Sequence, residues 1–181
     1  DDGVTICSHT KIHPNTSIGS GTYIGSFCSI GALPNLKGFD KSIESGLIIG
    51  SNNMINDHTV IARSKDSNSN TCIGNSNHIG HGAYLGHDAI IGNVTTLSAH
   101  VRISGHTQVD DFAHLGMSAF THQFTKVGKY AMVGALAKVV RDIPPYFLVD
   151  GNPAMMNVLI ACRYDFWKKY TRTRMENVPP A

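Results

Sequence analysis

Residues 73–104 read "IGNSNHIGHGAYLGHDAIIGNVTTLSAHVRIS", and an aliphatic side chain returns at every sixth position of this stretch. An α-helix would bury side chains about 3.6 positions apart and a strand about 2, so a period of six fits neither element alone. It predicts short strands separated by turns. The period runs to residue 139 through Ile73, Ile79, Leu85, Ile91, Leu97, Ile103, Val109, Leu115, Thr121, Val127, Val133 and Val139.

Three six-residue units would close one triangular coil of 18 residues. Each strand would pair with its equivalent one coil away, at about 4.8 Å, and the periodic aliphatic would point inward. The glycine that often follows it, as at Gly74, Gly80 and Gly86, is interpreted as a turn residue that tolerates positive φ. The sequence therefore predicts an all-β chain folded as a parallel β-helix.

The period also occurs upstream, and two stretches interrupt it. Ile12, Ile18, Ile24 and Ile30 share it, and Ile49, Ile55 and Ile61 resume it. Residues 31–47 shift the phase by one position, and residues 62–72 keep the phase but lack aliphatics. We expect both to be loops projecting from the corners of coils. Insertions in solenoids often map to a binding face, although a solvated loop without function is an equal alternative.

The C-terminal part has a different pattern. Pro144 and Pro145 cannot donate to a strand ladder, so we expect them to end the solenoid. We therefore divide the chain into a β-helix domain, 1–145, and a C-terminal extension, 146–181. Apolar residues at three- and four-residue spacing predict one amphipathic helix over about 155–175. They are Leu159, Cys162, Phe166 and Tyr170.

Composition excludes several classes of protein. The chain has 181 residues, 41% of them hydrophobic and 15% charged, and a formal net charge of +2. Such a small charge argues against nucleic-acid binding. We see no apolar run long enough for a membrane span and no signal peptide, so we expect a cytoplasmic protein, trimmed at its N-terminus because it begins without methionine. The four cysteines form no C-x-x-C pair, which argues against a zinc knuckle or disulfide framework.

Histidines gather on one side of the predicted coil. The six-residue units beginning at 85, 103 and 121 stack on one face, and they contain His87, His106 and His122. For any single histidine, surface packing is the more common role. For His87 the next residue favours a catalytic role. Asp88 could accept a hydrogen bond from the ring, fix its tautomer and stabilise its charged form.

Four segments carry a resemblance to a known family. They are "HIGHGAYLGHDAIIGN", "LSAHVRISGHTQVDDFAHLG", "FTHQF" and "VRDIPPYFLVDGNPA". Together, over about residues 12–154, the chain resembles the UDP-N-acetylglucosamine acyltransferases that begin lipid A synthesis. The resemblance implies a left-handed coil, a homotrimer and active sites between subunits. It also implies transfer of a 3-hydroxyacyl group from acyl carrier protein to the 3-hydroxyl of a UDP-amino sugar.

The resemblance also implies site residues. It makes His87 the general base, Asp88 the residue that orients it, and Gly105 the donor of an oxyanion N–H. It assigns substrate contacts to Lys37, Tyr84, His106, His122, Gln123 and Ala135. Ala135 falls where the family measures acyl length, and its methyl group predicts a medium-chain preference.

The sequence departs from the family at several positions. Tyr84 and Pro153 replace family histidines, and Asn35 stands two positions before Lys37, where the family has an acidic residue just before the lysine. The family's C-terminal helical domain, which contacts the nucleotide, is much longer. These departures most affect the residues that would recognise the UDP part of the substrate.

Other functions stay open. A hexapeptide-repeat carbonic anhydrase binds metal through histidines five residues apart, and no two of the ten histidines here have that spacing, so we expect no metal. We expect no cofactor beyond the phosphopantetheine of acyl carrier protein, and no nucleophilic cysteine or serine motif suggests a covalent intermediate. The alternatives are a sugar acetyltransferase that uses acetyl-CoA and a solenoid without catalysis.

Overall fold

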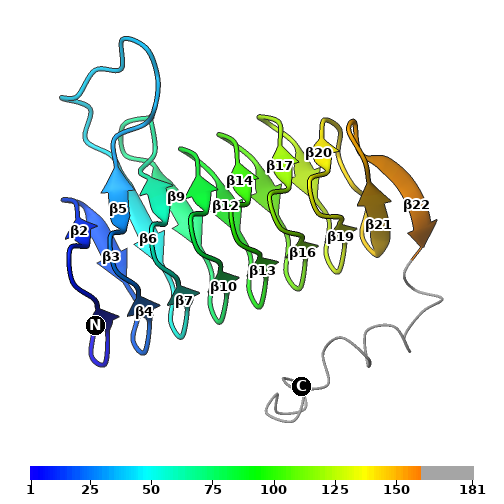
Figure 1. Cartoon of the computed structure of the whole chain (residues 1–181). Helices are drawn as coiled ribbons and strands as arrows, with labels where there is room; N and C mark the ends of the chain where they lie inside the picture. The colour runs from blue at the N-terminus through cyan, green and yellow to red at the C-terminus, as the bar shows by residue number, and fades with distance from the viewer. Residues whose placement is uncertain (160–181) are drawn as a thin grey trace.

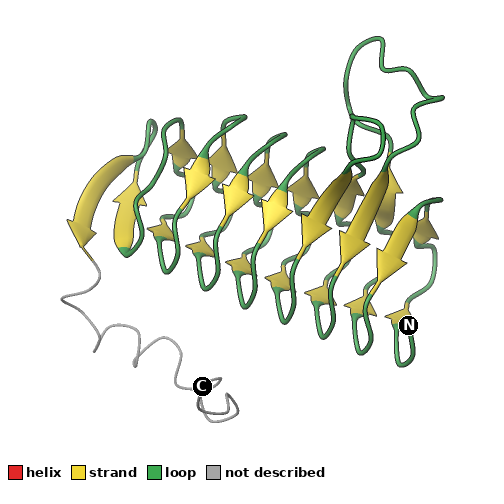
Figure 2. Cartoon of the chain, turned by 180° about the vertical axis from the view of Figure 1, so that it is seen from behind, coloured by secondary structure: helices red, strands yellow, loops and turns green. Residues whose placement is uncertain are grey.

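The chain winds as a parallel β-helix in the computed structural model, which describes residues 1–159 (Figure 1). The described part contains 22 strands in three sheets of nine, seven and six strands. Seen from the opposite side, the coils again stack along one axis (Figure 2). Within residues 1–159, no helix is long and apolar enough to cross a membrane.

The first sheet runs the full length of the described chain. Its strands are β1 Thr5–Ile6, β4 Tyr23–Ile24, β7 Met54–Ile55, β10 His78–Ile79, β13 Thr96–Leu97, β16 His114–Leu115, β19 Met132–Val133, β21 Phe147–Asp150 and β22 Met155–Leu159. All its pairs are parallel except β21 with β22, which is antiparallel.

The second and third sheets form the other two sides. The second contains β2 Lys11–Ile12, β5 Ser29–Ala32, β8 Val60–Ala62, β11 Tyr84–Leu85, β14 Arg102–Ile103, β17 Phe120–Thr121 and β20 Lys138–Val139. The third contains β3 Thr16–Ile18, β6 Gly46–Ile49, β9 Asn70–Ile73, β12 Ile90–Ile91, β15 Gln108–Val109 and β18 Lys126–Val127. We call the corner where the chain turns from the second sheet to the third the loop edge.

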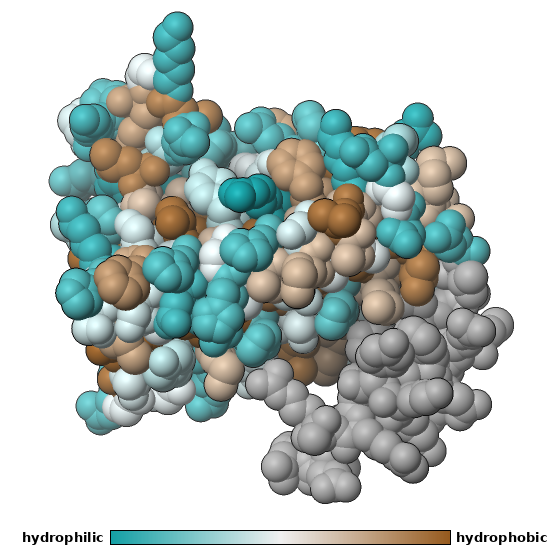
Figure 3. Space-filling model, in the orientation of Figure 1, coloured by the Kyte–Doolittle hydropathy of each residue, from teal (hydrophilic) through white to brown (hydrophobic). Residues whose placement is uncertain are grey.

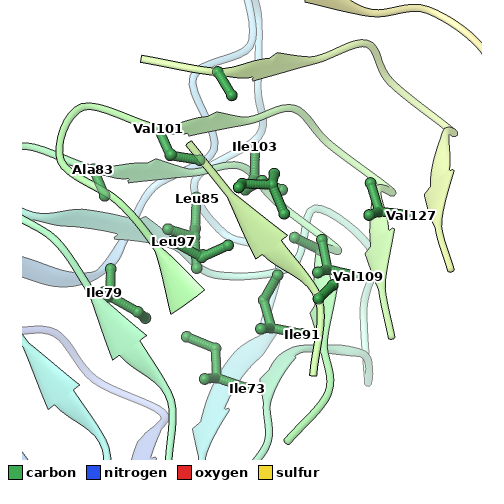
Figure 4. Packing of buried hydrophobic residues seen from close by; sticks show 14 of the residues in the cluster. Ile73, Ile79, Ala83, Leu85, Ile91, Leu97, Val101, Ile103, Val109 and Val127 are labelled. Atoms are coloured by element: carbon green, nitrogen blue, oxygen red, sulfur yellow. The ribbon is translucent and has the colours of Figure 1, made fainter. Parts of the chain in front are cut away.

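The predicted register is confirmed. Ile79 pairs with Leu97, and Leu85 pairs with Ile103, each 18 positions on. The periodic aliphatics form one continuous interior in which Ile79, Leu85 and Leu97 are 0% exposed. Figure 4 shows these side chains pointing inward from different sides of the prism. On the face seen in Figure 3, by contrast, polar and apolar side chains are mixed.

Both interruptions are loops, as predicted, and both lie on the loop edge. Residues 33–45 join β5 to β6, and residues 63–69 join β8 to β9. Ile30 pairs with Ile61, 31 positions on, and Ile61 pairs with Leu85, 24 positions on. The two coils therefore hold 13 and 6 residues more than 18. The predicted phase shift of one position is confirmed, because 13 residues are two six-residue units and one more. These residues belong to a single turn and project from the body (Figure 1).

The repeated glycines are not the positive-φ turn residues that the sequence predicted. Gly74, Gly80 and Gly86 do not have positive φ. They are needed because the coils approach closely: a Cβ built on Gly80 would lie 2.5 Å from the backbone nitrogen of Ala99. The left-handed conformation belongs instead, in most turns, to the residue three positions after the buried aliphatic, such as Asn52, with φ of 57°.

The C-terminal end also differs from the prediction. The prolines do not end the solenoid, because Ile143 bridges to Val127 and β21 pairs with β19 beyond them. Pro144 and Pro145 occupy a turn, where no ladder donor is required. The helix expected from residue 155 does not begin there, because residues 155–159 form β22 and pair with the open edge of β21. The remainder of that expected helix lies outside the described residues.

Val94 is an unfavourable residue for its turn. Its φ is 55°, a region that β-branched residues rarely adopt, and asparagine occupies the equivalent positions at Asn15 and Asn52. We expect Val94→Asn to raise the free energy of unfolding by about 1 kcal/mol, measured by urea denaturation, because asparagine tolerates this conformation. Val140, also exposed and without positive φ, provides the control: Val140→Asn should give no gain. A Val94→Asn variant no more stable than wild type would contradict the prediction.

Candidate active site on the loop edge

The loop edge brings together most of the predicted site residues. Six of these residues occupy the turns after β11, β14 and β17 in three successive coils, with two residues in each turn. These pairs are His87 and Asp88, Gly105 and His106, and His122 and Gln123. The prediction that the three histidines share one edge is confirmed.

His87 and Asp88 form a buried hydrogen-bonded pair. The His87 ring is 5% exposed, and its Nδ1 lies 2.7 Å from Oδ2 of Asp88. A carboxylate can only accept, so Nδ1 carries the proton and the Nε2 lone pair is left to act as a base. Asp88 sits at the left-handed turn position, with φ of 59°, which directs its side chain out of the corner.

The 63–69 loop and β9 hold Asp88 in place. Ser64 Oγ donates to Asp88 Oδ1, the Lys65 N–H donates to Oδ2 at 3.3 Å, and the Asp88 N–H donates to Thr71 Oγ1 at 2.8 Å. Burial alone would raise the pKa of the Asp88 carboxyl, but the hydrogen bonds from Ser64, His87 and Lys65 outweigh it, and the pKa is lowered. Asp88 is therefore an anion that can stabilise a protonated His87.

Gly105 makes room for the His87 ring. A Cβ built on Gly105 would lie 2.5 Å from Cε1 and 2.7 Å from Nε2 of that ring. At equivalent turn positions the N–H groups of Asn75 and Asn93 donate to side chains of the next coil. No described residue accepts the Gly105 N–H, so this buried donor is without a partner in the described part of the chain.

His106 lies between the pair and an aromatic ring that sequence reasoning missed. Its Nε2 is 3.7 Å from Asp88 Oδ2, and its ring meets that of His87 edge to face, with centroids 5.2 Å apart. On its other side it stacks on Phe124, with centroids 4.5 Å apart and an interplanar angle of 7°. Phe124 is 70% exposed, and its presence in the "HQF" segment was the only signal of a role.

The geometry of this cluster is also compatible with a metal ion. One potential ligand atom from each of His87, Asp88 and His106 falls within 4.8 Å of the others, and Nε2 of His106 is buried without a hydrogen-bond partner. Asp88 Oδ2, however, already accepts from His87 and the Lys65 N–H. A zinc ion here would have to compete with these two hydrogen bonds for Asp88 Oδ2.

A hollow of about 410 Å³ opens beside the cluster. Asp88, His106 and Phe124 line it from the loop edge, and Lys126 lines it from the third sheet. Of the cluster, Asp88 and His106 therefore border a space that can hold a ligand, and His87 lies behind them, bonded to Asp88.

The other predicted residues vary in their distance from the cluster. Tyr84 is half-buried on β11, and burial raises the pKa of its phenol. Lys37 is exposed in the 33–45 loop, and His122 is exposed, with its Nδ1 3.3 Å from the Gln123 carbonyl. Ala135 is exposed in the turn after β19, on the edge between the first and second sheets. The single chain does not bring Ala135 to the His87 cluster.

Comparison with curated proteins finds relatives that share one name. The chain is 35% identical over 159 residues to the acyl-[acyl-carrier-protein]–UDP-N-acetylglucosamine O-acyltransferase of Sinorhizobium fredii, covering 87% of this chain and 58% of that protein. It is 38% identical over 144 residues to the protein of the same name from Aliarcobacter butzleri, covering 78% of this chain and 55% of the relative. The chain thus spans little more than half the length of these relatives. Comparison with protein-family models finds no match.

Solved structures agree with these relatives. LpxA from Acinetobacter baumannii superposes with a TM-score of 0.78 at 27% identity, covering 97% of this chain and 75% of that one. LpxA from Bacteroides fragilis, a UDP-N-acetylglucosamine acyltransferase, superposes with a TM-score of 0.83 at 25% identity, covering 98% of this chain and 74% of that one. In sequence and in fold, the chain is similar to the UDP-N-acetylglucosamine O-acyltransferases. Its solenoid matches the left-handed β-helix of these acyltransferases, as the resemblance implied.

Gly105→Ala tests how the His87 ring is positioned. We expect the added methyl group to displace the ring and break its hydrogen bond to Asp88, which would remove the downfield proton NMR signal of the Nδ1–H. Ser104→Ala, one residue earlier in the same turn, should leave that signal in place. An unchanged signal in a folded Gly105→Ala variant would contradict the packing described above.

Proposed function

We propose that the chain transfers a 3-hydroxyacyl group from acyl carrier protein to the 3-hydroxyl of a UDP-amino sugar. The observation that carries the proposal is the buried His87–Asp88 hydrogen bond, with the opposite ring nitrogen packed against the backbone of Gly105. An acyl transfer of this kind needs a base and a donor for the developing oxyanion, and His87 Nε2 and the Gly105 N–H would serve as these two groups.

His87 would act as general base in a direct attack. Its Nε2 takes the hydroxyl proton while the sugar oxygen bonds to the thioester carbonyl carbon. The tetrahedral intermediate then collapses, the phosphopantetheine sulfur leaves, and that sulfur takes the proton from His87. Asp88 stabilises the imidazolium between these steps, and such proton transfer is worth about 10² to 10⁴ in rate.

Gly105 would stabilise the negative charge on the carbonyl oxygen. Its N–H has no acceptor among the described residues, and it adjoins the His87 ring. One positioned donor can contribute about 10² to 10³ in rate. Because the acid–base and oxyanion groups are all part of the chain, we propose that neither metal nor cofactor is needed beyond the carrier's phosphopantetheine.

We propose that the protein acts as a cytoplasmic homotrimer with sites between subunits. Ala135 lies on a different edge of the prism from His87, so only a neighbouring copy can bring an Ala135 side chain to the reacting groups. We propose that the substrates contact His106, which lines the hollow, and also His122, Gln123, Tyr84 and Lys37.

His87→Ala tests the chemistry. With purified 3-hydroxyacyl carrier protein and UDP-N-acetylglucosamine, we expect wild-type transfer, and a fall in kcat of about 10² to 10⁴ in the variant. His9→Ala, an exposed histidine of the first coil, serves as the matched control.

The outcomes separate the alternatives. Acetyl transfer from acetyl-CoA without transfer from the carrier would assign the chain to the sugar acetyltransferases. No transfer from either donor would favour a solenoid without catalysis. Activity lost on chelation and restored by zinc would place a metal among His87, Asp88 and His106.

Ala135 should limit acyl length. We expect wild type to prefer a medium chain, because the alanine methyl group shortens the groove relative to glycine, and Ala135→Gly to shift the preference toward longer chains. Ala135→Leu should shift it the other way. Mass spectrometry of the products from mixed acyl carriers measures both, and fastest transfer of the longest chain by wild type would contradict the role of Ala135.

A further inference from the structure

Ser64 is a fully buried polar residue that sequence reasoning missed and the family resemblance does not assign. It lies in the 63–69 loop and is 0% exposed. Its hydroxyl donates to Oδ1 of Asp88. The other carboxylate oxygen, Oδ2, receives His87 Nδ1 at 2.7 Å and the Lys65 N–H at 3.3 Å. Among the described residues, Ser64 is the single hydrogen-bond partner of Oδ1.

The direction of the Ser64 hydroxyl is set by its own turn. Its oxygen accepts the N–H of Asp66 at 3.0 Å, as serine often does two residues before a donor in a turn. The hydroxyl proton must therefore point elsewhere. The Asp66 carbonyl is one candidate acceptor, at 3.3 Å, but a carboxylate forms the stronger, charge-assisted bond.

The backbone of Ser64 is fixed on both sides. Its N–H donates to the Gly46 carbonyl at 3.1 Å, and its carbonyl accepts from Ser45 Oγ. Both partners belong to the end of the 33–45 loop and the start of β6. The hydroxyl therefore reaches Asp88 from a rigid support rather than from a free loop.

We propose that Ser64 is a positioning residue that holds the Asp88 carboxylate in the orientation needed to orient His87. By occupying Oδ1, Ser64 leaves Oδ2 to face the imidazole, and so fixes the tautomer and direction of the base. This inference rests on the proposed function for its kinetic test, whereas the orientation itself can be observed without activity. Ser64 touches no reacting atom and acts only through Asp88.

Ser64→Ala is the first test. We expect kcat to fall about tenfold with little change in KM, because one hydrogen bond to a charged group is lost while the substrate contacts remain. The NMR signal of the His87 Nδ1–H should broaden or shift. Ser64→Thr, which keeps the hydroxyl, should restore both readouts, and Ser67→Ala, an exposed serine of the same loop, should change neither.

A double-mutant cycle separates positioning from a merely structural role. In an Asp88→Asn background, Ser64→Ala should cause no further loss in kcat, since its partner charge is already gone. An equal loss in both backgrounds, or an unchanged kcat and NMR signal in Ser64→Ala, would overturn the proposal. If the alanine variant does not fold, Ser64→Cys, of similar size but a poor donor, gives the same comparison.

The NMR readout keeps the two hypotheses distinguishable. If the wild-type chain transfers no acyl group, the proposed function fails. The His87 signal in Ser64→Ala and Ser64→Thr then still decides whether Ser64 orients the pair.

Discussion

The structure depends on one repeated constraint: each side of a coil buries one side chain, aliphatic in nearly every case, directly above its equivalent in the coil before. Ile61, Leu85 and Ile103 show this stacking along the second sheet. Because the interior is narrow and continuous, an extra residue within a side would break the register of every later coil. Additional residues can therefore be accommodated only at corners, and both long insertions use the same corner.

The same stacking also brings the residues of the candidate site together. Residues at one turn position of successive coils are neighbours in space whatever their separation in sequence. Asp88, His106 and Phe124 all occupy the left-handed position of the loop edge, so they form a column. His87 and Gly105 occupy the position before it, where the absent side chain of the glycine leaves space for the imidazole. A regular scaffold thus places a histidine, the carboxylate bonded to it and an N–H without a described acceptor within one short segment of the loop edge.

The sequence predicted those parts of the molecule that depend on the period alone. The shared edge of His87, His106 and His122 follows from counting by 18, and so does the separation of His87 from its sequence neighbour His81. Contacts made by the insertions could not be counted in this way, because no period fixes where Ser64 lies. The C-terminal prediction failed for a related reason: the apolar spacing from Leu159 onward suggested a helix, while the unpaired edge of β21 offered residues 155–159 a strand partner.

The antiparallel strand β22 has a further consequence for how the protein behaves in concentrated solution. A solenoid whose last coil ended in a long, flat strand would offer backbone donors and acceptors to the first coil of another molecule, and could grow into fibres. In the described chain the direction of the ladder reverses at β22, while the second and third sheets end in strands of only two residues. A second molecule that approached this end of the first sheet would therefore meet a strand that runs opposite to the parallel ladder.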